Sequence, residues 1–382
     1  MHRLLILEAL TEIAGGQSVL IDLLPALASA YQVGAIVPGD GALSQALQSG
    51  GVEIFRTAMA DYQLIKKGRA DLLRFAVETP RLALIARRLI RSFNADIVYA
   101  NNSRTLVWGT LAAALAHRPV LWHIHNLFDD RKTLQLLQRL SRWRTVRRIL
   151  CASTQAADQF ADTPVAKLRM IPSGVDLKRF APAPEARDRF RIAHSIGTKV
   201  PLVGMVGDLI PLKGQLTFIE AASIVHRQLP EVRFWIIGRA RLTEESHSYE
   251  AQLRQRAAGL PIDFVGYQAD MPAILNALDV LVVASTTETG PLVLLEALGC
   301  GTLVLSTPVG RAQELLSGDA CGELFPIGDA NALAQKLMAL LNDIDRRTTM
   351  SRAARQCAIE QLSLETFRTR VLDEIAAVLR GA

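Results

Sequence analysis

The sequence has few of the residues that would tie it to a metal ion or a disulfide framework. Only four of its 382 residues are cysteine, at positions 151, 300, 321 and 357. They form no CxxC pair and have no histidine at metal-ligand spacing. We therefore interpret them as reduced core cysteines, which is typical of a cytoplasmic protein.

Long apolar runs are also missing, although 50% of the residues are hydrophobic. The longest run, around residues 106–116, is too short for a membrane span, which needs about 20 apolar residues. The opening MHRLLILEAL places only four apolar residues before Glu8, which predicts a buried strand rather than a secretory signal. We expect the protein to stay in the compartment where it is made.

Short apolar, β-branched runs alternate with helical patterns, and there are no internal repeats. The runs cover residues 4–7, 33–37, 96–100, 120–123 and 149–152, then 202–206, 232–237, 262–265, 280–284 and 303–306. Such alternation predicts parallel sheets with right-handed crossovers. The pattern is interrupted by SGVDLKRFAPAP at residues 173–184, so we predict an α/β protein of two doubly wound domains with a ligand cleft between them.

The most informative stretch is DVLVVASTTETGPLVLLEALGCG at residues 279–301. It predicts a strand, a polar loop and a helix that has Pro291 at its first position. A helix N-terminus at the end of a parallel strand favours anionic ligands. Glu288 lies in the loop, and Glu296 falls on an apolar helix face, where sugar or ribose hydroxyls are suitable donors to its carboxylate. The alternatives are a solvated Glu288 and a Glu296 that extends to water or pairs with a structural arginine.

The spacing of these carboxylates carries a family resemblance. Glu288 and Glu296 match the E-x7-E motif of retaining glycosyltransferases of the GT-B fold, and EALGCGTLVLSTPVG resembles a run found in glycosyltransferase family 4. The resemblance extends over nearly the whole chain. It implies two Rossmann-like domains that face each other across a cleft, and transfer of a sugar from a nucleotide donor with retained anomeric configuration.

Two motifs of the first domain fit this resemblance. TEIAGGQ at residues 11–17 follows the first strand, and its glycines Gly15 and Gly16 permit close approach of the backbone to a phosphate or sugar. VLWHIHN at residues 120–126 predicts a buried strand whose two histidines share one face. The resemblance assigns His125 to a donor-sugar hydroxyl near the reacting carbon, and we expect His123 to support it.

A motif of the second domain departs from the family. VGDLIPLKG at residues 206–214 resembles GRLxxxKG, in which Arg and Lys neutralise the diphosphate. Lys213 matches the motif, but Asp208 stands where Arg is expected. Arg239 or Arg311 are candidates for the missing cation, and either is also compatible with an ordinary surface arginine. We expect Asp208 to be turned away from the phosphates or paired with a nearby cation.

The charge is concentrated in the first part of the chain. Residues 1–180 contain 23 Lys and Arg against 14 Asp and Glu, whereas the rest carries a net charge of −3. The basic residues form two helical patterns, Arg81–Arg91 and Arg131–Arg148, the second interleaved with leucines and Trp143. A basic amphipathic helix favours an anionic lipid surface or a phosphorylated acceptor, and a merely solvated face is the alternative. Nucleic acid is disfavoured because no stacking aromatics accompany the charge.

The resulting hypothesis is a family 4-like hexosyltransferase that acts on a polysaccharide, glycolipid or cell-envelope acceptor. Residues 1–180 would form the acceptor-side domain and residues 181–362 the nucleotide-sugar domain, with a last helix at 363–382 that packs on the first. The catalytic candidates are His125 and Glu288. The donor-binding candidates are Gly15, Gly16, Lys213, Gly290, Pro291, Leu292, Glu296, Arg239 and Arg311.

We expect no metal or other cofactor, because no DxD pair lies beside the candidate donor site and Lys213 with backbone N–H groups can neutralise the phosphates. The expected location is cytoplasmic, with possible peripheral attachment to the inner membrane face. The alternatives are a GT-B phosphorylase or epimerase, or a non-catalytic binding subunit, for which Asp208 is the best support.

Overall fold

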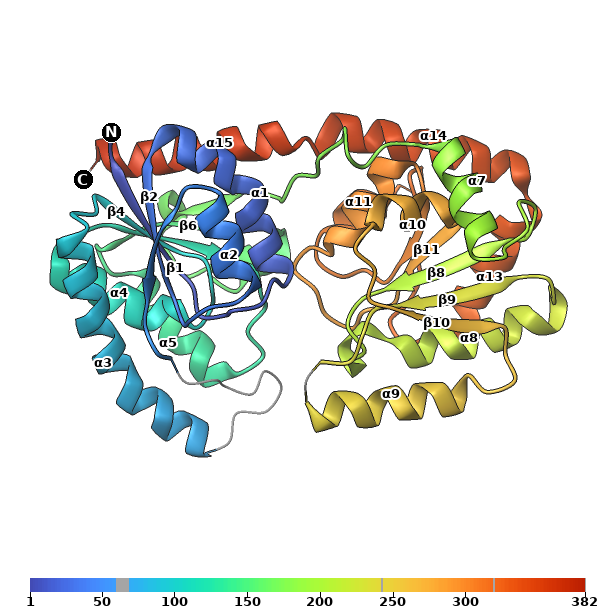
Figure 1. Cartoon of the computed structure of the whole chain (residues 1–382), viewed down its shortest axis with the longest axis horizontal. Coiled ribbons are helices and arrows are strands. Elements are labelled where there is room, and N and C mark those ends of the chain that lie inside the picture. The colour runs from blue at the N-terminus through green and yellow to red at the C-terminus, as the bar shows by residue number, and fades with distance from the viewer. Residues whose placement is uncertain (60–68, 242, 319, 382) are drawn as a thin grey trace. The chain divides into compact units, whose positions relative to one another are not determined.

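The computed structural model of the chain describes residues 1–59, 69–241, 243–318 and 320–381 (Figure 1). It divides into two compact units. Unit 1 consists of Met1–Pro172 with Glu365–Ala382, and unit 2 consists of Ser173–Leu364. The sequence placed the domain boundary near residue 180, and in the structure Val175 and Phe180 belong to a hydrophobic core of unit 2.

Unit 1 is built on a parallel sheet with the strand order β3-β2-β1-β4-β5-β6-β7. Its strands are β1 Arg3–Leu7, β2 Gln32–Val37, β3 Glu53–Arg56, β4 Ile97–Ala100, β5 Val120–Ile124, β6 Val146–Cys151 and β7 Leu168–Met170. Its helices are α1 Gly15–Ala30, α2 Ala42–Ser49, α3 Arg69–Ser92, α4 Thr105–Ala116, α5 Arg131–Ser141, α6 Thr154–Asp158, the 3-10 turn η1 Val165–Lys167 and α15 Leu364–Arg380.

Helices cover both faces of this sheet. Alternate strand residues such as Leu5 and Leu7 pack with α3, α4 and α5 in one core. Figure 1 shows α1, α2 and α15 on the other side of the sheet. The last helix is anchored there by charge, because Glu374 of α15 accepts from Arg148 at 2.6 Å and from Arg169 at 2.8 Å.

The second basic pattern does not form one helix, so that expectation was wrong. α5 ends at Ser141, and Arg147 and Arg148 lie in strand β6. The physical reason is the β-branched and apolar content of VRRILC, which forms a buried strand between β5 and β7 whatever its charge. Arg148 is committed to Glu374, whereas Arg131, Lys132 and Arg139 remain exposed on α5.

Unit 2 has the same doubly wound plan, with the strand order β10-β9-β8-β11-β12-β13. Its strands are β8 Leu202–Val206, β9 Arg233–Ile237, β10 Ile262–Gly266, β11 Val280–Val283, β12 Leu303–Ser306 and β13 Glu323–Leu324. Its helices are α7 Pro184–Ala193, η2 Pro211–Lys213, α8 Gln215–Gln228, α9 Glu244–Arg256, α10 Met271–Ala277, α11 Leu292–Cys300, α12 Arg311–Leu316, α13 Ala330–Asn342 and α14 Ile344–Gln361.

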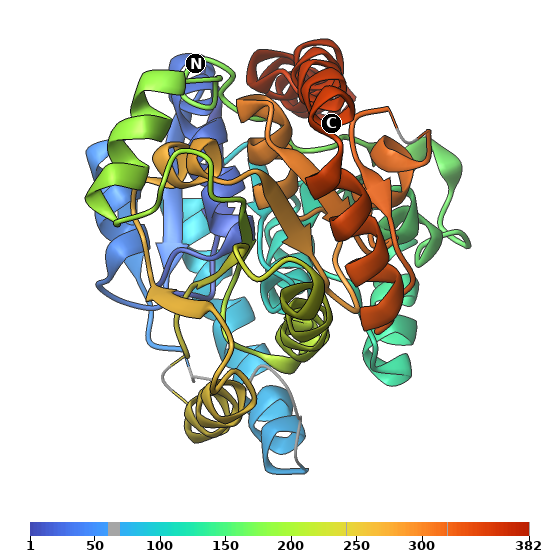
Figure 2. The same ribbon diagram turned by 90° about the vertical axis from the view of Figure 1, so that its right-hand side faces the viewer.

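Two hydrophobic cores of unit 2 lie on opposite faces of its sheet. Val280 and Val282 of β11 contribute to the core that contains α8 and α13 residues, whereas Leu281 and Val283 contribute to the core that contains α10 and α11 residues. This alternation is the period of two of an extended strand. Figure 2 gives a second view of the same layers.

In each sheet the chain reverses its direction of winding at one pair of strands. The reversal falls between β1 and β4 in unit 1 and between β8 and β11 in unit 2. Ligands of open α/β sheets bind beyond the carboxyl ends of strands at such a switch point. The loops after these four strands are therefore where functional side chains are expected.

Candidate functional site

In unit 2, two candidate residues meet at the switch point. Lys213 follows β8 and Glu288 follows β11, and the Lys213 Nζ forms an ion pair with the Glu288 Oε1. The hydroxyl of Ser285 donates to the same carboxylate oxygen at 3.1 Å. The sequence assigned Lys213 to a diphosphate and Glu288 to sugar hydroxyls, and these two side chains are direct neighbours.

The backbone holds the two loops against each other. The Thr286 N–H donates to the Leu212 carbonyl at 2.9 Å, so the loop after β11 is tied to the loop after β8. Gly214 has φ +74, and a Cβ there would lie 2.1 Å from the Ala284 carbonyl oxygen. Only glycine fits this close approach, so the residue directly after Lys213 packs against the chain where β11 ends.

Asp208 has a cation partner, as the sequence analysis expected. Its Oδ2 accepts from the Arg241 Nε at 2.7 Å. Arg241 was not among the candidates. The two residues are 33 positions apart in the chain and meet because β8 and β9 are adjacent strands, so no local pattern could reveal the pair. Arg239, one of the candidate cations, lies with its guanidinium 5.0 Å from the ring centre of Tyr267.

The helix after β11 begins slightly later than predicted. Pro291 is the N-cap residue of α11 rather than its first helical residue, and Leu292 begins the helix. The ψ angle of Pro291 is 109°, which is extended rather than helical, so the helix begins one residue later than predicted. Gly290 precedes this cap. Glu296 lies in the second turn and is half-buried, between half-buried Leu292 and buried Cys300 on its helix face.

Arg311 also follows a strand of unit 2, because it begins α12 after β12. Its residue surface is 8% exposed. The pKa of Cys357 is raised by its hydrogen bond with Cys321 and by burial, and the nearby charge of Arg311 opposes this shift. Arg311 is therefore a buried residue of unit 2 and not an ordinary surface arginine.

In unit 1, two other candidates lie in contact. His125 is the first residue after β5, and a Cβ added to Gly16 would lie 3.0 Å from the His125 Cγ. The absence of a side chain at Gly16 therefore lets the first turn of α1 pack against the imidazole. A Cβ on Gly15 would meet no atom within 4 Å, so its neighbourhood does not require glycine.

A buried polar network surrounds His125, and the sequence analysis missed its members. The His125 Nε2 lies 2.9 Å from the Asn101 Oδ1, and the Asn101 amide nitrogen donates to Glu8 at 2.5 Å. The Gln17 amide nitrogen donates to the other oxygen of Glu8 at 3.1 Å. Their positions could have been noticed in the sequence, because Glu8 and Asn101 are polar residues that directly follow apolar strand runs.

Burial controls the ionisation of this network. It raises the pKa of Glu8 to about 7, against the lowering effect of the hydrogen bonds from Asn101 and Gln17. It lowers the pKa of His125 to about 4, so the imidazole is neutral at neutral pH. His123 lies beside it with ring centres 4.0 Å apart and the ring planes tilted by 46°, as expected for residues on one face of a strand. The hydroxyl of Tyr99 lies 2.5 Å from the His123 Nδ1.

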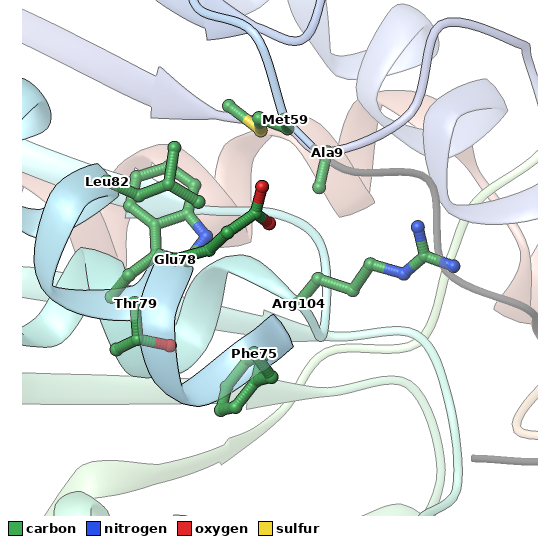
Figure 3. Close-up of a pocket in the computed structure, with 8 residues that line it drawn as sticks. Ala9, Met59, Phe75, Glu78, Thr79, Leu82 and Arg104 are labelled. Atoms are coloured by element: carbon green, nitrogen blue, oxygen red, sulfur yellow. The ribbon is translucent and has the colours of Figure 1, made fainter. Parts of the chain in front are cut away.

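Unit 1 also contains a pocket near the carboxyl ends of β1 and β3. It has about 300 Å³ of empty space, part of it open to solvent. Four segments line it, and Figure 3 shows their side chains around the hollow: Ala9, Met59, Phe75, Glu78, Thr79, Leu82, Arg104 and Trp108. The lining is mainly apolar, and the Thr79 hydroxyl is buried with no hydrogen-bond partner among the residues that the structure describes.

Among the described residues, no cluster of three His, Cys, Asp or Glu side chains has the geometry to hold a metal ion. No helix in the described ranges is both long and apolar enough to cross a bilayer.

The fold and the comparisons define the class of the protein. The two doubly wound units match the GT-B fold of solved structures such as HepE of Anabaena in complex with UDP-glucose, with a TM-score of 0.82, 21% identity and coverage of 99% of this chain and 100% of that one. The chain belongs to glycosyltransferase family 4. Residues 13–179 match the family described as Glycosyltransferase Family 4, and residues 186–357 match the family described as Glycosyl transferases group 1.

Curated relatives have the same activity class. The chain is 26% identical to the UDP-Gal:alpha-D-GlcNAc-diphosphoundecaprenol alpha-1,3-galactosyltransferase of Escherichia coli, over 67% of this chain and 69% of the relative. It is 29% identical to a GDP-mannose-dependent monoacylated phosphatidylinositol monomannoside mannosyltransferase of Corynebacterium glutamicum, over 82% of this chain and 78% of the relative. The predictions of the family, the GT-B fold and a glycosyltransferase activity are confirmed.

Proposed function

We propose that the protein transfers a sugar from a nucleoside diphosphate donor to a lipid-linked or cell-envelope acceptor, with retention of anomeric configuration. The observation that carries the proposal is the contact between Lys213 and Glu288 at the switch point of unit 2. Binding of the diphosphate needs a cation, and binding of the transferred sugar needs a group that accepts hydrogen bonds from its hydroxyls. The cation and this group must be adjacent, because the diphosphate and the sugar are adjacent in the donor. Relatives that use UDP-galactose and GDP-mannose support this class of donor.

Each candidate residue has a role in this proposal. Lys213, with the N-terminus of α11 at Gly290, Pro291 and Leu292, neutralises the departing diphosphate, and Glu296 accepts from the donor ribose. Glu288 and His125 bind hydroxyls of the transferred sugar. Catalysis is then mainly electrostatic stabilisation of the leaving diphosphate and of the positively charged sugar.

The ion pair between Asp208 and Arg241 weakens the case for a non-catalytic subunit. An unpaired carboxylate facing a diphosphate would repel it by about 1 kcal/mol in water and by more in an enclosed site. The partner guanidinium at 2.7 Å offsets that charge. Because Lys213 is paired with Glu288, the further positive charge that a diphosphate needs would come from Arg239 and Arg311, the other candidate cations.

For the acceptor, we propose that the pocket of unit 1 binds its apolar part. The pocket is lined by Met59, Phe75, Leu82 and Trp108, and lipid-linked acceptors named for the relatives have apolar portions. Phe75→Ala should raise the KM for the acceptor and leave donor hydrolysis unchanged. Val77→Ala, which alters a 68% exposed side chain of the same helix, is the matched control. Equal KM values in all three proteins would remove the pocket from the proposal.

We further propose a cytoplasmic enzyme that attaches peripherally to the inner membrane face, with no nucleic-acid partner. The exposed Arg131, Lys132 and Arg139 of α5 support an anionic surface as the partner.

The experiment that tests the function is release of nucleoside diphosphate from a panel of UDP-, GDP- and ADP-sugars. One donor should give turnover. Glu288→Ala should mainly lower kcat, because the sugar hydroxyl contact strengthens in the transition state, whereas Glu296→Ala should mainly raise KM. Wild-type kinetics in both variants would place the donor site elsewhere, and release dependent on inorganic phosphate as acceptor would favour a phosphorylase.

A further inference from the structure

Glu8 is a buried carboxylate that the proposed mechanism does not use. It is 0% exposed and directly follows β1, while Asn101 is 1% exposed and directly follows β4. β1 and β4 are the strands that flank the switch point of unit 1. Burying a carboxylate is costly, so a functional reason for its place is worth seeking.

The hydrogen bonds around Glu8 fix the orientation of the Asn101 amide. Above pH 7 Glu8 is mainly ionised, and an ionised carboxylate only accepts hydrogen bonds, so the Asn101 nitrogen faces the Glu8 Oε1, 2.5 Å away. The same nitrogen also lies 3.3 Å from the Gly16 carbonyl oxygen, another acceptor. The Asn101 Oδ1 is thereby directed to the other side, at the His125 Nε2.

The amide orientation in turn determines the protonation of the His125 ring. The Asn101 Oδ1 can only accept, so the Nε2 at 2.9 Å must carry the proton. A neutral imidazole has one N–H, which leaves the lone pair on Nδ1. Gly16 packs against the ring at Cγ and limits its rotation.

We propose that Glu8 is a positioning residue that acts through Asn101 to fix the ring orientation and the Nε2–H tautomer of His125. The proposal rests on the proposed function, in which His125 binds a hydroxyl of the transferred sugar. In this tautomer the Nδ1 is an acceptor rather than a donor toward that hydroxyl, and no binding energy is lost in selecting the tautomer. A carboxylate that only tied β1 to α1 and β4 would leave the tautomer of His125 unaffected.

The test is the 15N spectrum of the full-length protein with labelled histidine rings, in which the His125 signals are assigned by their loss in His125→Gln. In the wild type at pH 8, Nε2 should give the signal of a protonated nitrogen and Nδ1 that of an unprotonated nitrogen. Glu8→Gln should produce a mixture of tautomers, because the glutamine amide can present either its oxygen or its nitrogen to Asn101. Asn101→Leu, which removes the acceptor, should also change the spectrum.

Tyr99→Phe is the matched control. It removes a buried hydrogen bond from the neighbouring His123 and leaves the bonds among Glu8, Asn101 and His125 in place. His125 should keep its wild-type signals in this variant. If Glu8→Gln leaves the His125 signals unchanged, or if Tyr99→Phe shifts them equally, the positioning role is overturned.

Kinetics separate this inference from the function on which it rests. Glu8→Gln should lower kcat about 10- to 100-fold, as loss of a partner that orients a functional histidine does, with the donor KM within about twofold. If His125→Ala keeps the wild-type kcat, the proposed role of His125 fails although the spectra stand. If His125→Ala loses activity but Glu8→Gln keeps both kcat and tautomer, only the positioning role fails.

Discussion

Lys213 and Glu288 neutralise each other at positions that remain partly accessible, with side chains 28% and 18% exposed. A diphosphate that reaches Lys213 therefore competes with a carboxylate already in place. A charged ligand with two phosphates can share the ammonium group, which has three donors, without breaking the ion pair. The affinity for a nucleoside diphosphate therefore measures directly whether Lys213 binds the phosphates while it is paired with Glu288.

Lys213→Ala should weaken binding of the nucleoside diphosphate by roughly 1.5–3 kcal/mol, the range for a hydrogen bond to a charged group. Isothermal titration checks this, with Lys199→Ala at an exposed position of the same unit as the charge control. Binding of wild-type strength by Lys213→Ala would show that the diphosphate lies elsewhere.

Glu8 should make stability depend on pH. Its pKa is raised from 4.5 to about 7 in the folded protein, so the folded state holds the proton more tightly than the unfolded state does. The contribution of Glu8 is therefore most favourable below pH 4.5 and is lost as the pH rises to 7. The titratable side chains beside it, Tyr99 and His125, are neutral over this range, because burial raises the pKa of Tyr99 and lowers that of His125.

Glu8→Gln should consequently be more stable than the wild type at pH 8, by up to about 3 kcal/mol, and nearly equal to it at pH 4.5. Urea unfolding followed by tryptophan fluorescence suits the measurement, because Trp108, Trp122 and Trp143 lie in unit 1. Equal destabilisation at both pH values would mean that Glu8 is not buried as a charge.

At the scale of elements, α5 presents the exposed basic surface of unit 1. Arg131, Lys132 and Arg139 are exposed on this helix together with Leu136, which is 38% exposed, while Leu137 and Leu140 are buried. A helix with cations and an apolar side chain on its outer face can lie on an anionic bilayer.

Sedimentation with anionic vesicles should therefore exceed that with neutral vesicles and fall with salt, since each cation near the surface contributes about 1 kcal/mol. Exchanging Arg131, Lys132 and Arg139 for glutamate should abolish the preference for anionic vesicles. The charge-matched control is the same exchange at the exposed Lys199, Arg227 and Arg256 of unit 2. Equal losses in both triple variants would indicate an effect of net charge rather than of α5.

The elements show what sequence reasoning can and cannot supply. Strands such as β8 and β12 were predicted to the residue, because a short apolar run between polar segments determines its own ends. The end of α5 at Ser141 was missed, because basic residues at helical spacing continue into a strand whose burial depends on its neighbours.

Some residues of the candidate site could be predicted from the sequence and others could not. Lys213 and Glu288 could be found because each lies in a motif that a single segment carries. Arg241, Asn101 and Glu8 could not be assigned, because their roles arise from pairs of residues far apart in the chain. Only the strand order of the two sheets brings these pairs together.

For the whole molecule, we expect side chains and backbone N–H groups to neutralise the charge of the diphosphate. Activity should therefore survive EDTA, and addition of Mg²⁺ should change kcat by less than about twofold. Loss of turnover on chelation, restored by Mg²⁺ or Mn²⁺, would show that a metal ion shares this task.

The central claim is transfer with retained configuration, and the anomer formed in the first turnovers tests it most directly. Proton NMR of the product from an α-linked donor identified in the panel should show the α anomer before mutarotation of any hydrolysed sugar. The account predicts α product from the wild type and strongly reduced formation of the same anomer by Glu288→Ala. A β product would contradict it.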